Sequence, residues 1–454
     1  MFWGTTSAAS RNVTRTTEDH VQAMIDWLRS RGGTFNKKLE IRRADPDDSE
    51  SRFGMFAKHD IVSKEVLLDI PPSCLFTSGP PLVGDRVIVN FDESGEWSGA
   101  EVIGVNSARN KFHVLYDDGY EEKRVPATLL YKEDQQEAIC GTIHNLIEEM
   151  KLGDQSEFAP YVNYLLDLKP GQIPSAWSQA GQDLLNGILR TDLPPEEATG
   201  WSMSEMCGVS DDPFDQNAAF IQVWRSWDDV LIPVFDFMSH RNGHYLNTEN
   251  DNVLWSKPVL VRASRDIAAG EELYTSYNFC PDCGARAEYY GTAEIFRDYG
   301  FVEEFPQRWF FPKHDIAFSL EEEAGYGGLR VDWLQPKPSG RGIAFMERQI
   351  QRLKEILAAD LTSLDLDIPN EELDVIEQYC DALIVALSHA IDSLGNLEQS
   401  QGPNCSANSS ETCNASRSAR HELDDDDEEE ESDFNYGIDV CETGFCDPHS
   451  YVVS

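Results

Sequence analysis

The sequence predicts an α+β protein with more than one hydrophobic core and a charged C-terminal tail. Of its 454 residues, 41% are apolar and 10% aromatic, which is enough to build two or three cores. Strand-like runs fill residues 53–131 and 230–310, whereas helical periodicity marks the beginning and the end of the chain. Beyond Gln401 the composition turns to Ser, Asn and Gly and then to ELDDDDEEEESD, a run too charged to pack.

The first predicted elements are a helix and two strands. Residues 19–30 carry one apolar face at helical spacing behind two acidic residues, which favour a helix start. Extended runs follow at residues 53–57 and 66–70, and the second run stops at a Pro-Pro pair. The apolar face of the helix consists of Val21, Met24, Ile25 and Leu28.

Residues 82–131 have the pattern of a self-contained unit. The runs GDRVIVNF, WSGAEVIGV, KFHVLYDDG and EEKRVPATLL are separated by polar or glycine-containing turns. Four or five strands within so short a stretch predict a small β-barrel. Helical periodicity returns over residues 135–150, so the barrel is bounded on both sides and is an insertion.

The second half of the chain begins with strands and ends with helices. Residues 230–310 are rich in aromatic and β-branched side chains, which predicts strands and turns. Two amphipathic helices follow, over residues 343–357 and from Asn370 to Leu394. Asn370 and the two glutamates after it favour the start of the second helix. We expect the two helices to pack as a hairpin.

Charge and cysteine usage narrow the class of protein. The chain has 37 Lys and Arg against 81 Asp and Glu, and its charge of -44 would repel nucleic acid and favour basic peptides as partners. The same acidity is also consistent with solubility alone. The ten cysteines form no dense framework, and no secretory signal or long apolar run is present. We therefore expect an intracellular protein, in the nucleus or the cytoplasm, that binds neither nucleic acid nor membrane.

Three separated segments carry the motifs that point to an activity. They are SRFGMFAKHDIVSKEVLLDIP at 51–71, AAFIQVWRSWDDVLIPVFDFMSHRNGH at 218–244, and RDIAAGEELYTSYNF at 265–279 followed by YGFVEEFPQRWFF at 299–311. In sequence and in order, these segments resemble the SET-domain family of protein methyltransferases, specifically the branch that includes the Rubisco large-subunit methyltransferase. The resemblance implies a SET β-fold split by the inserted barrel, with S-adenosylmethionine (SAM) as methyl donor.

The first segment is expected to hold the methionine part of SAM. The resemblance assigns this role to Arg52, Phe53 and Gly54, since a glycine lets the main chain come close to a ligand. Taken alone, Gly54 is also consistent with a simple turn.

The second segment is expected to supply further SAM contacts. Arg225 can pair with the SAM carboxylate, because a guanidinium fork fits a carboxylate; the alternative is a surface cation. His240 is expected near the adenine as a binding and structural residue, although a satisfied core histidine fits the pattern too. Ser239 stands where the family has Asn, and a hydroxyl replaces only part of what a carboxamide donates and accepts.

The third segment supplies the candidate catalytic residue. The resemblance places Tyr277, directly after GEELYTS, at the channel that joins SAM to the substrate, whereas the alternative is a core tyrosine. Methyl transfer needs an in-line lysine nitrogen with a free lone pair, which desolvation and the sulfonium charge favour, so no strong base is required. A tyrosine hydroxyl and backbone carbonyls can hold the amine and the methyl group.

The resemblance therefore implies a SAM-dependent protein N-methyltransferase acting on lysine. The expected partner is a protein or peptide with an accessible lysine, a histone-like basic segment being one candidate. Relatives include enzymes that methylate histidine, so the fold alone does not fix the acceptor.

The inserted unit resembles a Tudor domain through its "GD.V" start and its "YDDG" strand end. Tudor barrels bind methylated ammonium groups in an aromatic cage, because ring faces attract a poorly hydrated cation. Phe91, Trp97 and Tyr116 match three cage positions, and the fourth falls on Gly119 with Tyr120 beside it. The same rings are equally consistent with barrel core. The alternative function is therefore a catalytically inactive SET scaffold that acts as a Tudor-type reader of methylated basic peptides.

A CPDC motif, Cys280 to Cys283, follows Tyr277. A CxxC pair is only half of a zinc site, so we predict no metal; zinc completed by Cys441 and Cys446 is the alternative. The predicted division of the chain is an N-terminal part of the SET domain at 19–80, a Tudor-like barrel insertion at 81–131, the SET core at 132–312, a helical C-terminal lobe at 313–400 and a disordered acidic tail at 401–454.

Overall fold

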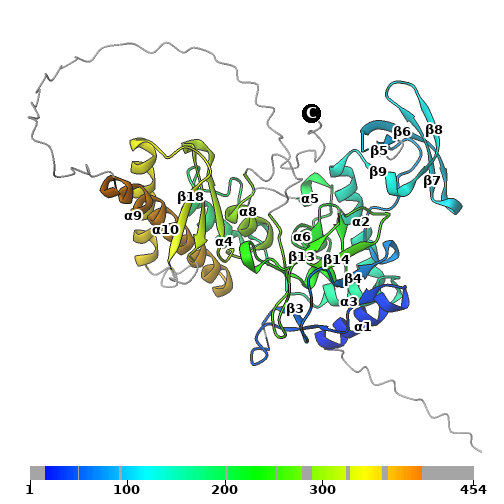
Figure 1. Cartoon of the computed structure of the whole chain (residues 1–454), viewed down its shortest axis with the longest axis horizontal. Coiled ribbons are helices and arrows are strands. Elements are labelled where there is room, and N and C mark those ends of the chain that lie inside the picture. The colour runs from blue at the N-terminus through cyan, green and yellow to red at the C-terminus, as the bar shows by residue number, and fades with distance from the viewer. Residues whose placement is uncertain are drawn as a thin grey trace, which may run out of the picture.

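The computed structural model describes residues 16–49, 51–91, 95–199, 203–251, 253–278, 289–323, 328–359 and 367–400. The predicted tail and the CPDC motif lie outside the described residues. Figure 1 shows three groups of elements: a central unit, a sheet inserted into it, and a C-terminal unit. Each group encloses a hydrophobic core of its own. None of the described helices combines the length and the apolar character that a membrane crossing requires.

The central unit is built from short strands and helices around one core. Its antiparallel sheet has the order β1-β4-β14-β13, and the two-stranded pairs are β2-β3 and β10-β11, both antiparallel, and β12-β15, which is parallel. The strands are β1 (Thr34–Phe35), β2 (Leu39–Arg43), β3 (Phe53–Ala57), β4 (Val66–Ile70), β10 (Ser226–Trp227), β11 (Val230–Leu231), β12 (Ser239–His240), β13 (Thr248–Asn250), β14 (Val259–Ala263) and β15 (Tyr274–Thr275). The helices are α1 (Thr17–Ser30), α2 (Gln135–Leu152), α3 (Ala159–Leu166), α5 (Met203–Met206) and α6 (Pro213–Arg225).

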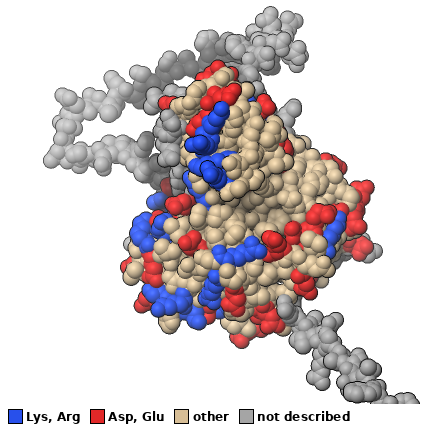
Figure 2. Space-filling model, turned by 90° about the vertical axis from the view of Figure 1, so that its right-hand side faces the viewer, with Lys and Arg blue, Asp and Glu red and all other residues tan. Residues whose placement is uncertain are grey.

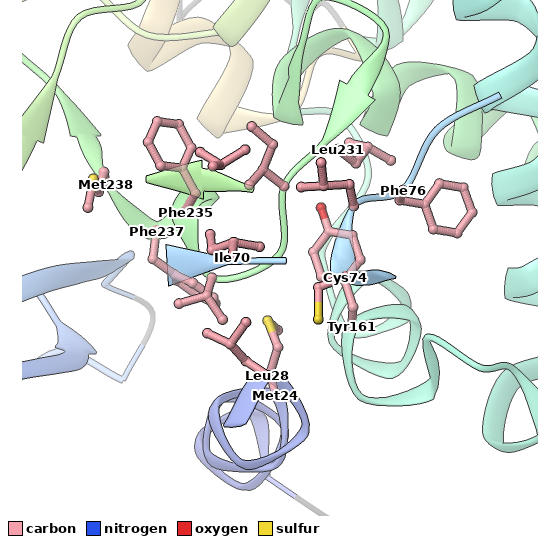
Figure 3. Packing of buried hydrophobic residues seen from close by; sticks show 14 of the residues in the cluster. Met24, Leu28, Ile70, Cys74, Phe76, Tyr161, Leu231, Phe235, Phe237 and Met238 are labelled. Carbon is pink, nitrogen blue, oxygen red and sulfur yellow. The ribbon is translucent and has the colours of Figure 1, made fainter. Parts of the chain in front are cut away.

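Helix α1 covers one side of the central core. The backbone N–H of Asp19 donates to the Thr16 hydroxyl, and the Thr16 N–H donates to the Asp19 carboxylate, a capping box that fixes the helix start. Met24 and Leu28 are fully buried, and Figure 3 shows them pointing toward the strand that carries Ile70. The helix predicted over residues 19–30 is confirmed and begins two residues earlier.

The inserted sheet has five antiparallel strands in the order β8-β7-β6-β5-β9. Burial alternates along β7, where Phe112, Val114 and Tyr116 point into the core. The register shifts between Val102 and Gly104, and such a bulge bends a strand. Among the described residues no pairing joins β8 to β9, so the predicted strands are present but the predicted closed barrel is not. The strands are β5 (Arg86–Asn90), β6 (Trp97–Asn106), β7 (Lys111–Tyr116), β8 (Glu121–Pro126) and β9 (Leu130–Lys132).

The C-terminal unit combines helices with an antiparallel sheet of order β16-β17-β18. The predicted helical lobe is therefore incomplete, because β17 and β18 lie within it and pair with β16 across residue 312. Most of β17 is continuously buried, and a short apolar run without alternation gives no clear strand signal. Helices α9 and α10 pack against each other, as predicted. The elements are α4 (Gln179–Leu189), α8 (Thr292–Tyr299), β16 (Gln307–Phe311), β17 (Ile316–Glu322), β18 (Leu329–Trp333), α9 (Gly340–Ala358) and α10 (Asn370–Ser400).

A disulfide joins Cys140 of α2 to Cys207, which follows α5. The two residues are 67 positions apart, and the irregular spacing of the ten cysteines gave no sign of this pairing. The disulfide ties the segment before α6 to α2, and α6 ends at Arg225 of the candidate site.

Candidate active site

Three distant segments of the chain meet in the central unit. Strands β12 and β15 pair in parallel, which sets Ser239 beside Tyr274. Strand β3 is bridged to the same segment between Phe56 and Glu272. The three motif segments of the sequence are thereby neighbours in space.

Tyr277 lies just beyond the end of β15 and is held at both ends. Its backbone N–H donates to Nδ1 of His240 over 3.0 Å, and its hydroxyl donates to the carbonyl oxygen of Met238 over 2.7 Å. Its ring centroid lies 5.0 Å from that of His240 and 4.6 Å from that of Tyr299. Because the hydroxyl proton is directed at Met238, the oxygen keeps its lone pairs for another partner.

The electrostatic surroundings of Tyr277 keep its phenol neutral. Burial raises the pKa of the Tyr277 hydroxyl to about 12. Two ion pairs, Arg225–Asp236 and Arg52–Glu272, also act on this pKa: in each pair the arginine lowers it and the carboxylate raises it. The hydroxyl therefore stays protonated throughout the neutral pH range and acts as a hydrogen-bonding group rather than as a base.

His240 connects Tyr277 to a buried carboxylate. Its Nε2 lies 2.8 Å from Oε1 of Glu303, and both side chains are 1% exposed. Since Nδ1 accepts a hydrogen bond from the Tyr277 backbone, Nε2 carries the ring proton and donates a hydrogen bond to Glu303. Glu303 also accepts from the side chains of Asn242, Asn278 and Thr292. His240 thus positions Tyr277, and sequence analysis missed Glu303 because nothing in VEEF distinguishes its two glutamates.

Arg225, at the end of α6, is a buried residue and not a surface cation. Its Nη1 donates to the Asp236 carboxylate over 3.2 Å, and its Nη2 donates to the Tyr164 hydroxyl over 2.8 Å. The Tyr161 hydroxyl also donates to Asp236. Burial raises the pKa of the Asp236 carboxyl, whereas Arg225 lowers it. Within the described residues, Nε of Arg225 and Oδ1 of Asp236 have no hydrogen-bond partner.

Arg52, Ser239, Glu272 and Tyr274 form a second polar cluster. The Arg52 guanidinium donates to both Glu272 oxygens, over 2.5 and 3.1 Å, and to the Ser239 hydroxyl over 2.6 Å. The hydroxyls of Ser239 and Tyr274 also donate to Glu272. Burial alone would raise the pKa of Glu272, but its bonds to Arg52 and Ser239 hold that pKa below its ordinary value. Glu272 is therefore ionised at neutral pH.

At Gly54, where the sequence predicts a close approach to SAM, the nearest atoms in the structure belong to this cluster. A Cβ atom at Gly54 would lie 2.5 Å from Oε1 of Glu272 and 3.0 Å from Nη1 of Arg52. The absence of a side chain thus leaves room for the ion pair. Phe53, the residue before it, packs edge-on against Phe237 at 6.4 Å.

The site offers charges for an organic ligand. Two ion pairs, Arg52–Glu272 and Arg225–Asp236, lie around Tyr277 and can bind carboxylate and ammonium groups. In the part of the chain that the structure describes, no group of three or more His, Cys, Asp or Glu side chains is arranged to hold a metal ion.

The inserted sheet carries a separate aromatic cluster. The rings of Phe91, Tyr116 and Tyr120 are in mutual contact, with centroids 5.6 to 6.0 Å apart. Tyr120 is exposed, and the Tyr116 hydroxyl donates to Glu122 over 2.6 Å. Trp97, the other predicted cage residue, packs against Tyr131 at 5.3 Å.

The protein thus combines helices and sheets, and segments that are distant in sequence surround the partly buried Tyr277. Residues 52–278, half of the chain, match the family model described as the SET domain. The chain belongs to the SET-domain family.

Two solved structures are similar at low identity. One is described as the SET domain of LSMT bound to lysine and AdoHcy; it is 12% identical with a TM-score of 0.38, and the match covers 85% of this chain and 92% of that chain. The other is described as Rubisco LSMT bound to sinefungin and monomethyllysine, at 12% identity and a TM-score of 0.39, covering 84% and 93%. No curated protein matches the sequence.

Proposed function

We propose that this protein is a SAM-dependent protein-lysine N-methyltransferase. The observation that carries the proposal is the placement of Tyr277: its hydroxyl is neutral, fixed on the Met238 carbonyl and adjacent to two ion pairs. The substrate is a protein or peptide that presents an accessible lysine, basic histone-like segments included. Membership of the SET-domain family supports the same reaction.

The residues around Tyr277 fit a cofactor with an amino-acid end. Arg52 and Glu272 offer opposite charges, and buried Arg225 and Asp236 each keep one polar atom without a partner among the described residues. When bound, SAM would supply a methyl group activated by its sulfonium sulfur.

The side chains then orient the acceptor. The Tyr277 oxygen can accept a hydrogen bond from the lysine amine, since its own proton is held by Met238. Burial next to this phenol strips water from the amine and lowers its pKa, which frees the lone pair for attack. His240 and Glu303 hold the backbone of Tyr277 in place, and this fixes the position of its hydroxyl.

The test is transfer of a labelled methyl group from SAM to proteins of a cell lysate and to core histones. Tyr277→Phe should lower the rate about 100-fold or more, because it removes one preorganised polar group from the reaction centre. Tyr379→Phe is the matched control: the Tyr379 hydroxyl also donates to a backbone carbonyl, that of Pro194, over 2.7 Å, but in the core of the C-terminal unit. Mass spectrometry of the labelled protein would show whether lysine or histidine is modified. Equal activity of the two variants would contradict the role of Tyr277.

A second candidate function is favoured by the contact among Phe91, Tyr116 and Tyr120. We propose that this cluster, on a Tudor-like sheet, binds a methylated lysine, whose cation is attracted to ring faces. Glu122, on the Tyr116 hydroxyl, adds a negative charge beside the rings.

Calorimetry with unmodified, dimethylated and trimethylated lysine peptides would separate the two functions. Tyr120→Ala should abolish binding of methylated peptides and leave methyl transfer unchanged. The control is His113→Ala, on the same sheet, whose side chain pairs with Glu121. A protein that binds methylated peptides but neither binds SAM nor transfers label is a reader built on an inactive SET scaffold.

A further inference from the structure

We propose that the Arg52–Glu272 ion pair recognises the α-amino-acid end of the cofactor, with the cofactor carboxylate on Arg52 and its ammonium on Glu272. The inference rests on the proposed function, which makes SAM the ligand. It moves the carboxylate contact from Arg225, where the sequence motif placed it, to Arg52.

The two arginines differ in how accessible they are. The Arg225 side chain is 11% exposed, and its two terminal nitrogens already bond to Asp236 and Tyr164. The Arg52 side chain is 54% exposed, so one side of its guanidinium can receive a ligand while the other stays on Glu272. A carboxylate arriving from solvent therefore meets Arg52 more readily than Arg225.

The pair also matches the charges of the ligand. The amino-acid end of SAM carries one carboxylate and one ammonium group, the same two charges as Glu272 and Arg52. When the ligand's carboxylate bonds to Arg52 and its ammonium to Glu272, no charge is left unpaired in a partly buried site. Glu272 is 10% exposed and is fixed by the hydroxyls of Ser239 and Tyr274, so it supplies a preformed site for the ammonium.

Ser239 fits the same arrangement. Its hydroxyl accepts from Arg52 over 2.6 Å and donates to Glu272 over 2.6 Å, so it connects the two charges. The same guanidinium nitrogen of Arg52, Nη1, contacts both the Ser239 hydroxyl and a Glu272 oxygen. The Ser239 hydroxyl has a single hydrogen to donate, whereas the Arg52 guanidinium beside it has several N–H donors. Ser239 and Arg52 thus both bind Glu272 and hold it in place.

The test compares two ligands that differ only at the proposed contact. S-adenosylhomocysteine has the amino-acid end, whereas 5′-methylthioadenosine keeps the nucleoside and the sulfur but lacks that end. Titration calorimetry of the full chain gives the ratio of their affinities. Arg52→Ala and Glu272→Gln should each reduce this ratio about tenfold or more, and the affinity for methylthioadenosine should stay within about twofold.

Matched controls come from another ion pair of the central unit. Lys64 and Glu249 lie 2.7 Å apart on the surface, so Lys64→Ala and Glu249→Gln change the same charges without touching the site. These variants should leave the ratio unchanged. Circular dichroism of each variant would confirm that the chain is folded.

Three results would overturn the inference. If Arg52→Ala weakens both ligands equally, Arg52 has a structural role only. If Arg225→Lys collapses the ratio while Arg52→Ala preserves it, the carboxylate contact belongs to Arg225. If the wild-type chain binds neither ligand, the proposed function fails as well, and this outcome is distinct from the first two because in those the wild-type chain binds S-adenosylhomocysteine.

Discussion

The side chains of the candidate site depend on two buried carboxylates, Glu272 and Glu303. A buried charge is tolerated only when hydrogen bonds compensate for lost water. Glu303 receives four side-chain donors and Glu272 receives three, so each carboxylate organises the residues around it. The positions of the site's side chains therefore depend on Glu272 and Glu303.

We predict that Glu303→Gln lowers the free energy of unfolding by about 1–3 kcal/mol, because an amide cannot accept all the bonds that the carboxylate accepts. Methyl transfer should fall as well, since His240 would no longer fix the Tyr277 backbone. Urea unfolding at pH 7 measures the first effect. The control is Glu304→Gln: Glu304 is 72% exposed and pairs with Arg241 at the surface, so a change within about 0.5 kcal/mol is expected. If Glu303→Gln lowers the free energy of unfolding no more than Glu304→Gln does, the hydrogen bonds of Glu303 do not contribute the predicted stability.

The sequence predicted the residues of the site better than their partners. Tyr277, His240 and Arg225 stand in recognisable motifs, and the structure brings them together. Two of the partner carboxylates are distant in sequence: Glu272 follows Arg52 by 220 positions and Glu303 follows His240 by 63. A single sequence has no signal for such pairings, because an acidic residue in an apolar run looks the same with or without its cation.

At the scale of elements, the inserted sheet is fastened to the central unit by the connection between β13 and β14. The Trp255 indole donates to the backbone of Leu130, and the Ser256 hydroxyl donates to that of Ala127. The Trp255 ring also meets Phe112 of the sheet's core at 6.3 Å. A cavity of about 100 Å³ at this junction is lined by Trp255 and by Asp229.

Asp229 makes the junction sensitive to pH. Burial, aided by the charge of Asp228, raises the pKa of the Asp229 carboxyl from its ordinary value of 3.8 to about 6. The folded state then binds more protons than the unfolded state between these two values. The stability contributed by this group is fully present below pH 3.8 and is lost as the pH rises through about 6.

We therefore predict that Asp229→Asn stabilises the protein by up to about 3 kcal/mol at pH 8 and that this gain shrinks steadily toward pH 4. Thermal unfolding of both proteins at pH 4, 5, 6 and 8 measures the difference. A gain of the same size at every pH would mean that the change in packing, and not the charge, is responsible.

Elements with strong periodicity were predictable, and buried short strands were not. Helix α1 and the α9–α10 pair show an apolar face at helical spacing, which the structure confirms. The sheet of the C-terminal unit was missed because β17 is apolar at nearly every position and alternation is absent. The inserted strands were recognised by their turns, but closure of a sheet depends on pairings that no local pattern encodes.

At the scale of the whole molecule, the net charge of -44 is the main source of electrostatic repulsion. Figure 2 shows acidic and basic side chains intermingled on one face, and the surface ion pairs that result oppose the general repulsion only locally. An exposed ion pair contributes at most about 1 kcal/mol. Repulsion among the unbalanced acids acts over longer distances and destabilises the compact state.

Salt weakens both the attraction within surface ion pairs and the repulsion among the excess acids, and these two changes affect stability with opposite signs. Raising the ionic strength from about 0.01 M to about 0.15 M shortens the screening length from about 30 to about 8 Å, which weakens long-range repulsion more than contacts at 3 Å. We predict that the melting temperature rises by a few degrees over this range. Differential scanning calorimetry in sodium chloride, repeated with sodium fluoride to exclude chloride binding, measures it. A melting temperature that falls with salt would mean that local ion pairs such as Lys64–Glu249 outweigh the net charge.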